Sequence, residues 1–263
     1  MTISKDHQYE RLIRLIGPED YAKLRRSHLL IMGVGGVGSW AAEALARLDI
    51  GRFTLVDYDI VRPSNINRQL IATPRQLGRL KCEVMRERIL EINPEAEVTC
   101  LPIKYLPERC QEVWAGEYDA IVDAIDNITA KCHLLVEARR RNIPIVTSTG
   151  AAGRLDPSQV KITDLSHTKV DPVALQVRKK LRRDYYYPAN KSFHIPAVYS
   201  EEIPRPPLDT ESILPASSSF VDSDPDEDRP RRHAPPYGTV SFVVGAFGLM
   251  VAGKITELLL ENL

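Results

Sequence analysis

The chain has 263 residues, of which 43% are hydrophobic and 27% are charged, a composition typical of a soluble globular protein. Its 35 lysines and arginines balance its 35 acidic residues, so bulk charge cannot attract nucleic acid. The 4 cysteines form no CxxC pair or zinc-finger spacing, and residues 1–20 are too polar for a signal peptide. We therefore expect a reduced, cytoplasmic enzyme with no membrane anchor.

Residues 28–153 alternate short apolar runs with helical patterns. The run Leu29–Met32 is apolar at consecutive positions, as in a strand that is covered on both faces. Alternating strands and helices predict a doubly wound, Rossmann-like α/β fold with a mostly parallel sheet. Ligands bind such sheets at the carboxyl ends of the strands. The predicted strands of this region are 28–32, 52–56, 97–103, 120–124 and 144–147.

The remaining residues extend this fold at both ends. Two more strands, 159–165 and 195–200, flank a basic helix from about Asp171 to Arg183. The apolar part of the last helix stops at Lys254, short of the roughly 20 residues that span a bilayer, so we expect a buried or interface helix rather than a membrane anchor. We predict one domain over residues 1–263, composed of an N-terminal helix (1–27), a nucleotide-binding core (28–153), strands with a basic helix (154–202), a mobile Pro/Asp/Ser-rich loop (203–236) and a closing helix (237–263).

The turn after the first strand predicts a phosphate site. Gly33, Gly35 and Gly38 satisfy the GxGxxG spacing, and a helix is expected to begin near Gly36. Glycine lets the backbone approach an anion closely, and the helix N-terminus directs unpaired N–H groups at it. Asp57 closes the second strand, where a carboxylate reaches the ribose hydroxyls. These residues suit NAD and ATP alike.

The segment after Asp57 favours ATP. It brings Asn65 and Arg68 back toward the strand ends, and Lys81 begins the next helix. A triphosphate carries more charge than the two phosphates of a dinucleotide, and arginine and lysine are its usual partners. The alternative is that Arg68 and Lys81 are solvated surface charges.

Asp126 and Asn127 follow the fourth strand into the same crevice. A carboxylate beside a triphosphate can hold Mg²⁺, which prefers carboxylate and phosphate oxygens. Asn127 can also cap the helix that starts near Ile128. We expect both roles to coexist.

The clusters GVGGVGSW, DYDIVRPSNINRQ, Lys81 and DAIDN together resemble the ThiF-type family of adenylating enzymes, which is similar to ubiquitin-activating enzymes. The resemblance implies ATP and Mg²⁺ as cofactors, with Arg68, Lys81 and Asp126 as catalytic residues and Asp126 as the Mg²⁺ ligand. It also implies a homodimer in which Arg14 reaches the ATP site of the neighbouring subunit. The implied ATP-binding residues are Gly33, Gly35, Gly36, Gly38, Asp57, Asp59, Asn65, Arg68, Lys81, Asp126 and Asn127.

Thr149–Gly153, Asp156–Pro157 and Val160–Leu165 resemble one subfamily, the tRNA threonylcarbamoyladenosine dehydratases. This resemblance implies that ATP adenylates the carboxylate of threonylcarbamoyladenosine in tRNA. The modification's own nitrogen then closes a ring, so AMP leaves and net water is lost. No cysteine follows Cys132, and a thioester or persulfide mechanism therefore lacks an evident carrier.

A tRNA substrate requires a positive surface on this neutral chain. The helix after Asp171 carries cations that can hold phosphates, and the run Tyr185–Tyr187 can stack on unpaired bases. A solvated helix face with tyrosines covering the core explains the same pattern. The cations are Arg178, Lys179, Lys180, Arg182 and Arg183.

Three other functions stay open on the sequence. They are activation of a ubiquitin-like or sulfur-carrier protein, an NAD(P)-dependent oxidoreductase that uses the same glycines and Asp57, and a non-catalytic tRNA-binding scaffold. A sulfurtransferase-type partner, a bound monovalent cation and the base for ring closure are not identified by any motif.

Overall fold

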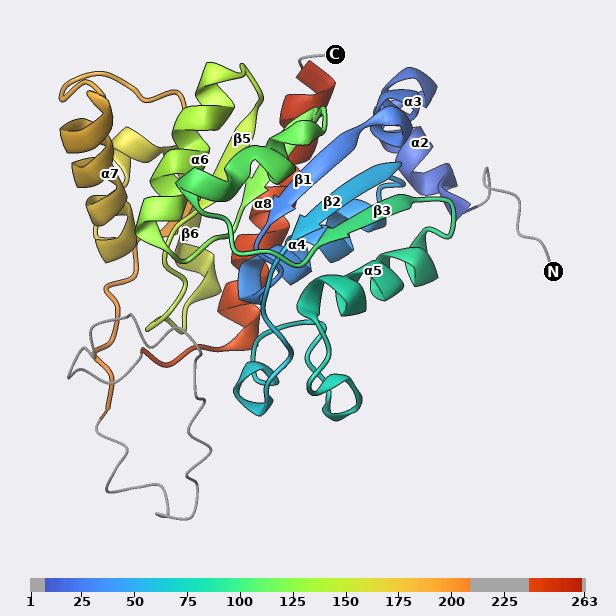
Figure 1. Cartoon of the computed structure of the whole chain (residues 1–263), viewed down its shortest axis with the longest axis horizontal. Helices are drawn as coiled ribbons and strands as arrows, with labels where there is room; N and C mark the ends of the chain where they lie inside the picture. Colours follow the sequence, from blue (N-terminus) through green and yellow to red (C-terminus); the bar gives the residue numbers. More distant parts are fainter. Residues whose placement is uncertain (1–7, 209–236, 262–263) are drawn as a thin grey trace.

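The computed structural model describes residues 8–208 and 237–261, and within them a seven-stranded sheet lies between two layers of helices (Figure 1). The strand order is β3-β2-β1-β4-β5-β7-β6, and only the β6–β7 pair is antiparallel. The order reverses between β1 and β4, where such folds bind ligands. The predicted doubly wound, mostly parallel fold is confirmed. The strands are β1 (His28–Met32), β2 (Arg52–Val56), β3 (Glu97–Leu101), β4 (Ala120–Asp123), β5 (Ile145–Ser148), β6 (Val160–Asp164) and β7 (Pro196–Ser200).

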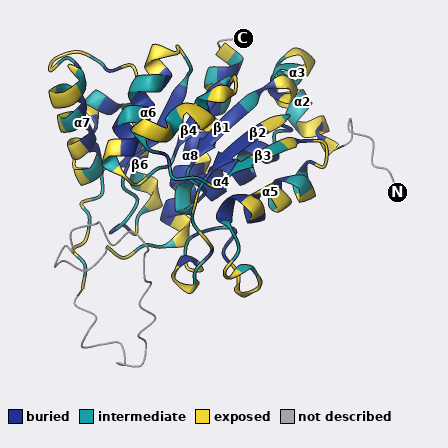
Figure 2. Ribbon diagram, in the orientation of Figure 1, coloured by how far each residue is buried: buried dark blue, intermediate teal, exposed yellow. Residues whose placement is uncertain are grey.

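Successive strand residues pack into different layers. Leu29 and Ile31 join the core beneath α4, α5 and α8, whereas Leu30 and Met32 join the core beneath α6 and α7. Figure 2 shows the buried residues along the strands and the inner sides of the helices. The helices are α2 (Glu10–Ile16), α3 (Pro18–Arg26), α4 (Gly36–Ala46), α5 (Lys81–Ile92), α6 (Ile128–Arg140), α7 (Pro172–Tyr185) and α8 (Ser241–Glu261). The 3₁₀ segments are η1 (Pro63–Asn65), η2 (Pro74–Gln76), η3 (Pro107–Ala115), η4 (Pro157–Gln159) and η5 (Leu165–His167).

Two boundaries differ from the prediction because of prolines. The expected N-terminal helix is divided into α2 and α3, since Gly17 adopts a φ of 84° and Pro18 starts a new helix. β3 ends at Leu101 rather than Ile103, because Pro102 has no N–H to continue the ladder. Of the loop predicted over 203–236, residues 209–236 lie outside the described residues.

The closing helix α8 lies in the core layer beside α4. By length and composition alone it could cross a membrane, but half of its most apolar window is buried in the protein. A Cβ on Gly248 would lie 2.6 Å from the Val37 carbonyl oxygen, so α8 and α4 approach too closely for a side chain there. The helix is therefore a core element, as we expected.

Candidate functional site

A cavity of about 430 Å³ opens at the carboxyl ends of β1, β2, β3 and β4. Its wall is built by the turn after each of these strands and by the start of α5. The topology thus collects residues from separate parts of the chain at the switch point of the sheet. The predicted ATP-binding residues that line it are Gly33, Gly35, Gly36, Asp57, Asp59, Asn65, Arg68, Lys81, Asp126 and Asn127.

The glycine turn after β1 leaves no room for a side chain at Gly33 or Gly38. Gly33 has a φ of 88°, and a Cβ there would lie 2.8 Å from the Ala124 carbonyl oxygen. Gly38 was predicted to bind ATP, but it is absent from the cavity wall formed by the described residues. A Cβ on Gly38 would lie 1.8 Å from the Gly33 carbonyl oxygen. Its role is therefore to let α4 pack against the turn.

Asp57 is held at the end of β2 by backbone groups. Its carboxylate accepts hydrogen bonds from the Val34 N–H at 2.7 Å and the Asp59 N–H at 2.9 Å. Burial raises the pKa of Asp57, although the positive charge of Lys81 opposes this change. The carboxylate stands beside the glycine turn, in a position suited to the predicted ribose contact.

Lys81 is a buried side chain and not a solvated surface charge. Its Nζ lies 2.8 Å from Asp59 Oδ2, and its backbone N–H donates to the Asp59 carbonyl oxygen. Both side chains were predicted as ATP ligands, but the sequence did not show that they pair with each other. The ion pair places a cation on the cavity wall near η1.

The 3₁₀ turn η1 supports the remaining predicted polyphosphate residues. Asn65 is buried, and its Oδ1 accepts from the Arg62 N–H at 3.0 Å. Arg68 Nη1 donates to the Ser64 carbonyl oxygen at 2.7 Å and to Asn67 Oδ1 at 3.1 Å. These contacts keep the Arg68 guanidinium at the rim of the cavity.

The turn after β4 presents an exposed carboxylate to the cavity. Asp126 and Asn127 both line the wall, and Asn127 Oδ1 also caps α6 by accepting from the Ala130 N–H at 3.0 Å. Within residues 8–208 and 237–261, no group of three or more His, Cys, Asp or Glu side chains could hold a metal. Mg²⁺ is usually bound by one or two carboxylates together with the phosphate oxygens of a substrate. The single carboxylate of Asp126 therefore fits an ion that is bound together with ATP.

Several residues of the wall were not predicted from the sequence. Ile103, Lys104, Tyr105 and Leu106 line it after β3, whose carboxyl end lies at the same edge of the sheet. Tyr105 is fixed there because its Oη lies 2.9 Å from His133 Nδ1. The other unpredicted polar residues of the wall are Tyr58, Arg62, Ser64 and Gln69.

Gln69 carries an unusual buried amide. The side chain lines the cavity, and its Oε1 has no hydrogen-bond partner among the described residues. An unsatisfied buried oxygen costs about 1–3 kcal/mol, which a ligand donor can recover. Gln69 directly follows Arg68 at the end of DYDIVRPSNINRQ, so its place in that cluster could have indicated it as a site residue.

Arg14 lies far from the cavity of its own chain. α2 and α3 flank the beginning of β1, at the amino edge of the sheet (Figure 1). The exposed Arg14 side chain pairs there with Glu10, with 2.6 Å between Nη2 and Oε1. Arg14 can therefore serve an ATP site only in a neighbouring subunit, as the resemblance implies.

Most of the predicted RNA-binding cations on α7 have partners within the protein. Lys180 and Arg183 pair with Asp184, Arg182 donates to the Ala189 carbonyl oxygen, and Arg178 donates to Thr168 Oγ1. Lys179 is exposed and has no partner among the described residues.

The two tyrosines that follow α7 differ in role: one covers the core, and the other is available to stack on an RNA base. Tyr187 is only 8% exposed and packs on Phe193 with 4.9 Å between ring centroids. Tyr186 is 90% exposed and has a φ of 57°, in the left-handed region. Tyr187 therefore covers the core, and Tyr186 is the ring that can stack on a base.

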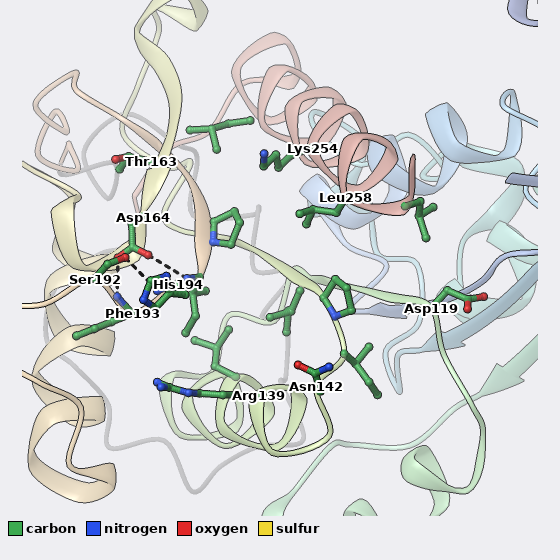
Figure 3. Close-up of a pocket in the computed structure, with 18 of the residues that line it drawn as sticks. Asp119, Arg139, Asn142, Thr163, Asp164, Ser192, Phe193, His194, Lys254 and Leu258 are labelled. Atoms are coloured by element: carbon green, nitrogen blue, oxygen red, sulfur yellow. Dashed lines mark hydrogen bonds between the residues drawn. The ribbon is translucent and has the colours of Figure 1, made fainter. Parts of the chain in front are cut away.

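A larger cavity of about 950 Å³ opens at the opposite, amino edge of the sheet (Figure 3). Asp164 lies in its wall and accepts from the Phe193 and Ile195 N–H groups, each at 3.0 Å. Burial opposes ionisation, but hydrogen bonds from Ser166 and Phe193 outweigh it and lower the pKa of Asp164 to about 2. Among the described residues, this wall contains no predicted site residue.

The chain is similar to known proteins over nearly its whole length. The sequence model of the ThiF family matches residues 9–262. A tRNA threonylcarbamoyladenosine dehydratase from Haemophilus influenzae is 37% identical over 95% of this chain and 92% of its own length. The Bacillus subtilis dehydratase is also 37% identical, over 98% of this chain and 96% of its own length.

Solved structures agree with these relatives. The crystal structure of the Escherichia coli dehydratase in complex with ATP has a TM-score of 0.84 at 32% identity, and the match covers 100% of this chain and 98% of that one. A complex of the same enzyme with AMP has a TM-score of 0.83. The chain therefore belongs to the ThiF family, among its tRNA threonylcarbamoyladenosine dehydratases.

Proposed function

We propose that this protein uses ATP to adenylate the carboxylate of N6-threonylcarbamoyladenosine in tRNA and then cyclises the modification. The observation that carries the proposal is the convergence of the glycine turn, Asp57, Arg68, Lys81 and Asp126 on one cavity. The relatives with this activity in their names match nearly all of the chain, and one of them was crystallised with ATP and with AMP.

Adenylation overcomes the poor reactivity of a carboxylate. A carboxylate oxygen attacks the α-phosphorus, the bond to the β-phosphate breaks, and pyrophosphate leaves. The glycine turn and the N-terminus of α4 align the phosphates, while Arg68 and Lys81 neutralise the charge that develops on pyrophosphate. Asp126 would hold Mg²⁺ together with phosphate oxygens, and the ion would supply further positive charge there.

Ring closure needs no enzyme nucleophile. The modification's own nitrogen attacks the activated carbonyl carbon, loses its proton and expels AMP, so the two steps together remove one water. Burial raises the pKa of Cys132 to about 12, and both a hydrogen bond with Cys100 and burial raise the pKa of Cys82. Among the described residues no cysteine lines the nucleotide cavity, which agrees with an intramolecular reaction.

The assembly and the RNA surface belong to the same proposal. The protein acts in the cytoplasm as a homodimer in which Arg14 of each subunit reaches the other subunit's ATP site. Lys179, Arg183 and Tyr186 contact the tRNA. The N-cap of α7, Asp171, contacts Thr149 just after the carboxyl end of β5, and the 14 residues of the helix span about 21 Å. Its basic end therefore lies beyond the reacting carboxylate and meets other nucleotides of the substrate.

The test is a reaction of the purified protein with ATP, Mg²⁺ and tRNA that carries the modification. We expect AMP and, by mass analysis of the nucleosides, a product lighter by one water. Formation of AMP only with a glycine-terminated carrier protein would replace the proposal with carrier activation. Nicotinamide cofactor binding that excess ATP does not diminish would replace it with redox chemistry.

A further inference from the structure

The turn that presents Asp126 rests on a buried ion pair between β4 and α6. The side chains of Lys131 and Asp123 are 1% and 0% exposed, and Lys131 Nζ lies 2.7 Å from Asp123 Oδ2. Lys131 Nζ also donates to Thr147 Oγ1 at 3.3 Å and to the Ser148 carbonyl oxygen at 3.0 Å. All the ammonium hydrogens are therefore used inside the protein.

The same carboxylate shapes the turn after β4. Asp123 Oδ2 accepts from Thr147 Oγ1 at 2.6 Å, and Asp123 Oδ1 accepts from the Ile125 N–H at 3.2 Å. Ile125 and Asp126 both line the nucleotide cavity. Lys131 thus determines which way Asp123 faces, and Asp123 determines the path of the chain into Asp126.

The beginning of this turn is attached to β1, and its end is attached to Asp123. The Ala124 N–H donates to the Met32 carbonyl oxygen at 2.9 Å, and a Cβ on Gly33 would lie 2.8 Å from the Ala124 carbonyl oxygen. Ala124 is therefore fixed beside the glycine turn independently of Lys131, whereas the path of Ile125 and Asp126 depends on the Asp123 carboxylate. Buried ion pairs seldom stabilise a fold more than apolar residues of the same volume do, so stability alone does not explain this one.

We infer that Lys131 is a positioning residue for the nucleotide site, which acts through Asp123 and Thr147 to hold the Asp126 turn in the geometry that binds Mg²⁺ and the terminal phosphates of ATP. The inference rests on the proposed function for its ligand. Its test uses binding without tRNA, however, so it can fail while the tRNA reaction is observed, and the reverse also holds.

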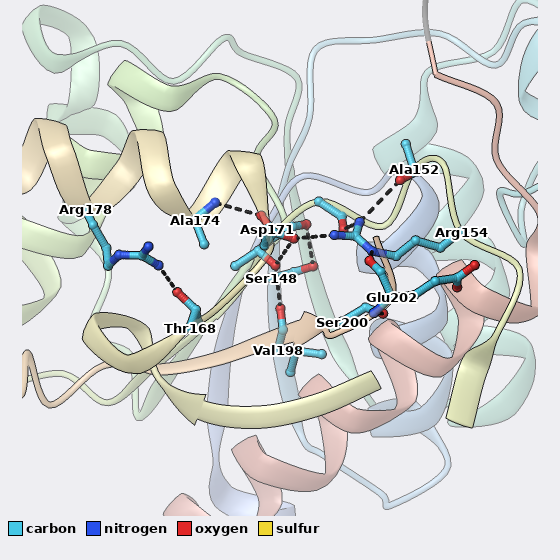
Figure 4. Close-up of polar contacts among 12 residues, drawn as sticks. Ser148, Ala152, Arg154, Thr168, Asp171, Ala174, Arg178, Val198, Ser200 and Glu202 are labelled. Atoms are coloured by element: carbon cyan, nitrogen blue, oxygen red, sulfur yellow. Dashed lines mark hydrogen bonds and ion pairs between the residues drawn. The ribbon is translucent and has the colours of Figure 1, made fainter. Parts of the chain in front are cut away.

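A second buried ion pair in the same protein provides the matched control. Arg154 and Asp171 have side chains 1% and 0% exposed, with 2.9 Å between Nη2 and Oδ2 (Figure 4). Arg154 also donates to the carbonyl oxygens of Gly150, Ala152 and Glu202. This pair joins the loop after β5 to α7 and β7, and within the described part of the chain none of its members lines the nucleotide cavity.

The experiment compares Lys131→Met with Arg154→Met by calorimetric binding of Mg·ATP and of AMP, together with thermal unfolding. Each variant leaves a buried carboxylate unpaired, so both lose stability. Only Lys131→Met is expected to weaken Mg·ATP binding, by about 10-fold to 100-fold, as is typical when the support of a metal ligand is removed. AMP lacks the terminal phosphates, so its Kd should stay within about threefold of wild type in both variants.

Two isosteric variants, two positions apart at the end of β5, keep the test valid if Lys131→Met does not fold. Thr147→Val removes the hydroxyl that contacts Asp123, and Thr149→Val removes the hydroxyl that donates to Asp171 Oδ2 at 3.0 Å. We expect Thr147→Val to weaken Mg·ATP about threefold or more and Thr149→Val to leave it unchanged. Equal Kd values for Mg·ATP in the two threonine variants, or equal losses for ATP and AMP in Lys131→Met, would overturn the inference.

Discussion

The two edges of the sheet differ in how their polar side chains are used. At the carboxyl edge, Arg68, Lys81 and Asp126 line a cavity of about 430 Å³. At the amino edge the cavity is about 950 Å³, but Asp119 and Asp164 there accept hydrogen bonds from backbone N–H groups. The larger cavity is lined by none of the predicted site residues among those that the structure describes. The topology of the sheet, rather than volume, locates the site.

Most of the cations at the basic end of α7 have partners within the protein, as the aspartates at the amino edge do. Arg182 stacks on Phe193, a wall residue of the larger cavity, with 5.4 Å between the guanidinium carbon and the ring centroid. Cations on a single helix find carboxylates within the next turn, as Lys180 does with Asp184. Polar residues at the ends of the parallel strands also have partners within the chain, as Lys81 does with Asp59, but their side chains line one shared cavity.

The largest effect is expected at the carboxyl edge from Arg68→Ala. The variant removes a charge that neutralises pyrophosphate, so kcat/KM for AMP formation should fall by about 100-fold or more. Thermal unfolding should be unchanged. Arg75→Ala, an exposed arginine in the same segment that lies outside the cavity wall of the described residues, is the matched control. Equal rates for the two variants would show that Arg68, although it lines the cavity, contributes no more to the reaction than an exposed arginine outside it.

Asp126→Asn should have the next largest effect. The amide is a weaker Mg²⁺ ligand than the carboxylate, so the Mg²⁺ concentration for half-maximal AMP formation should rise by about 10-fold to 100-fold. AMP binding measured by calorimetry should be retained. A magnesium dependence identical to that of wild type would show that the metal is held elsewhere.

The tyrosines after α7 test the amino edge with a smaller effect. Tyr186→Ala should weaken tRNA binding by about 1 kcal/mol through lost stacking, and Tyr186→Phe should retain it. Tyr187→Ala should instead reduce the free energy of unfolding by about 3 kcal/mol, because a buried ring is lost. Filter-binding and denaturant titrations measure the two quantities. Unchanged tRNA affinity in Tyr186→Ala would leave the amino edge without an RNA contact.

The smallest effect is expected from Asp164→Asn and depends on pH. The pKa of Asp164 is lowered to about 2 in the folded state, so its ionised form stabilises the fold above the ordinary aspartate pKa of 3.8. This contribution is lost as the pH falls through about 2. The variant should be less stable than wild type at pH 7, and the difference should vanish in strong acid. A difference in unfolding temperature that does not change with pH would contradict this role.

The positions of the strands, and the edge of the sheet that carries the cavity, were largely predictable from the sequence. Apolar runs placed β1, β2 and β7 to within a residue, and turn residues such as Gly33 and Asp57 identified the binding edge. Gly38 shows the limit of such motifs, since its spacing suggested a phosphate contact and its surroundings show a packing role. Residues 103–106, which line the cavity after β3 and were not predicted, belong to no recognisable sequence motif.

Patterns along the chain were sufficient for the fold class and for many of the polar residues that line the cavity at the carboxyl edge, because periodicity, turn chemistry and the position after a strand are local properties. Tertiary contacts alone revealed that Lys81 pairs with Asp59, that Lys131 pairs with Asp123, and that Arg14 lies at the amino edge of its own subunit. The two ion pairs form because different elements of the chain meet, and the position of Arg14 depends on how far α2 lies from the cavity. Such relations arise only when the layers pack.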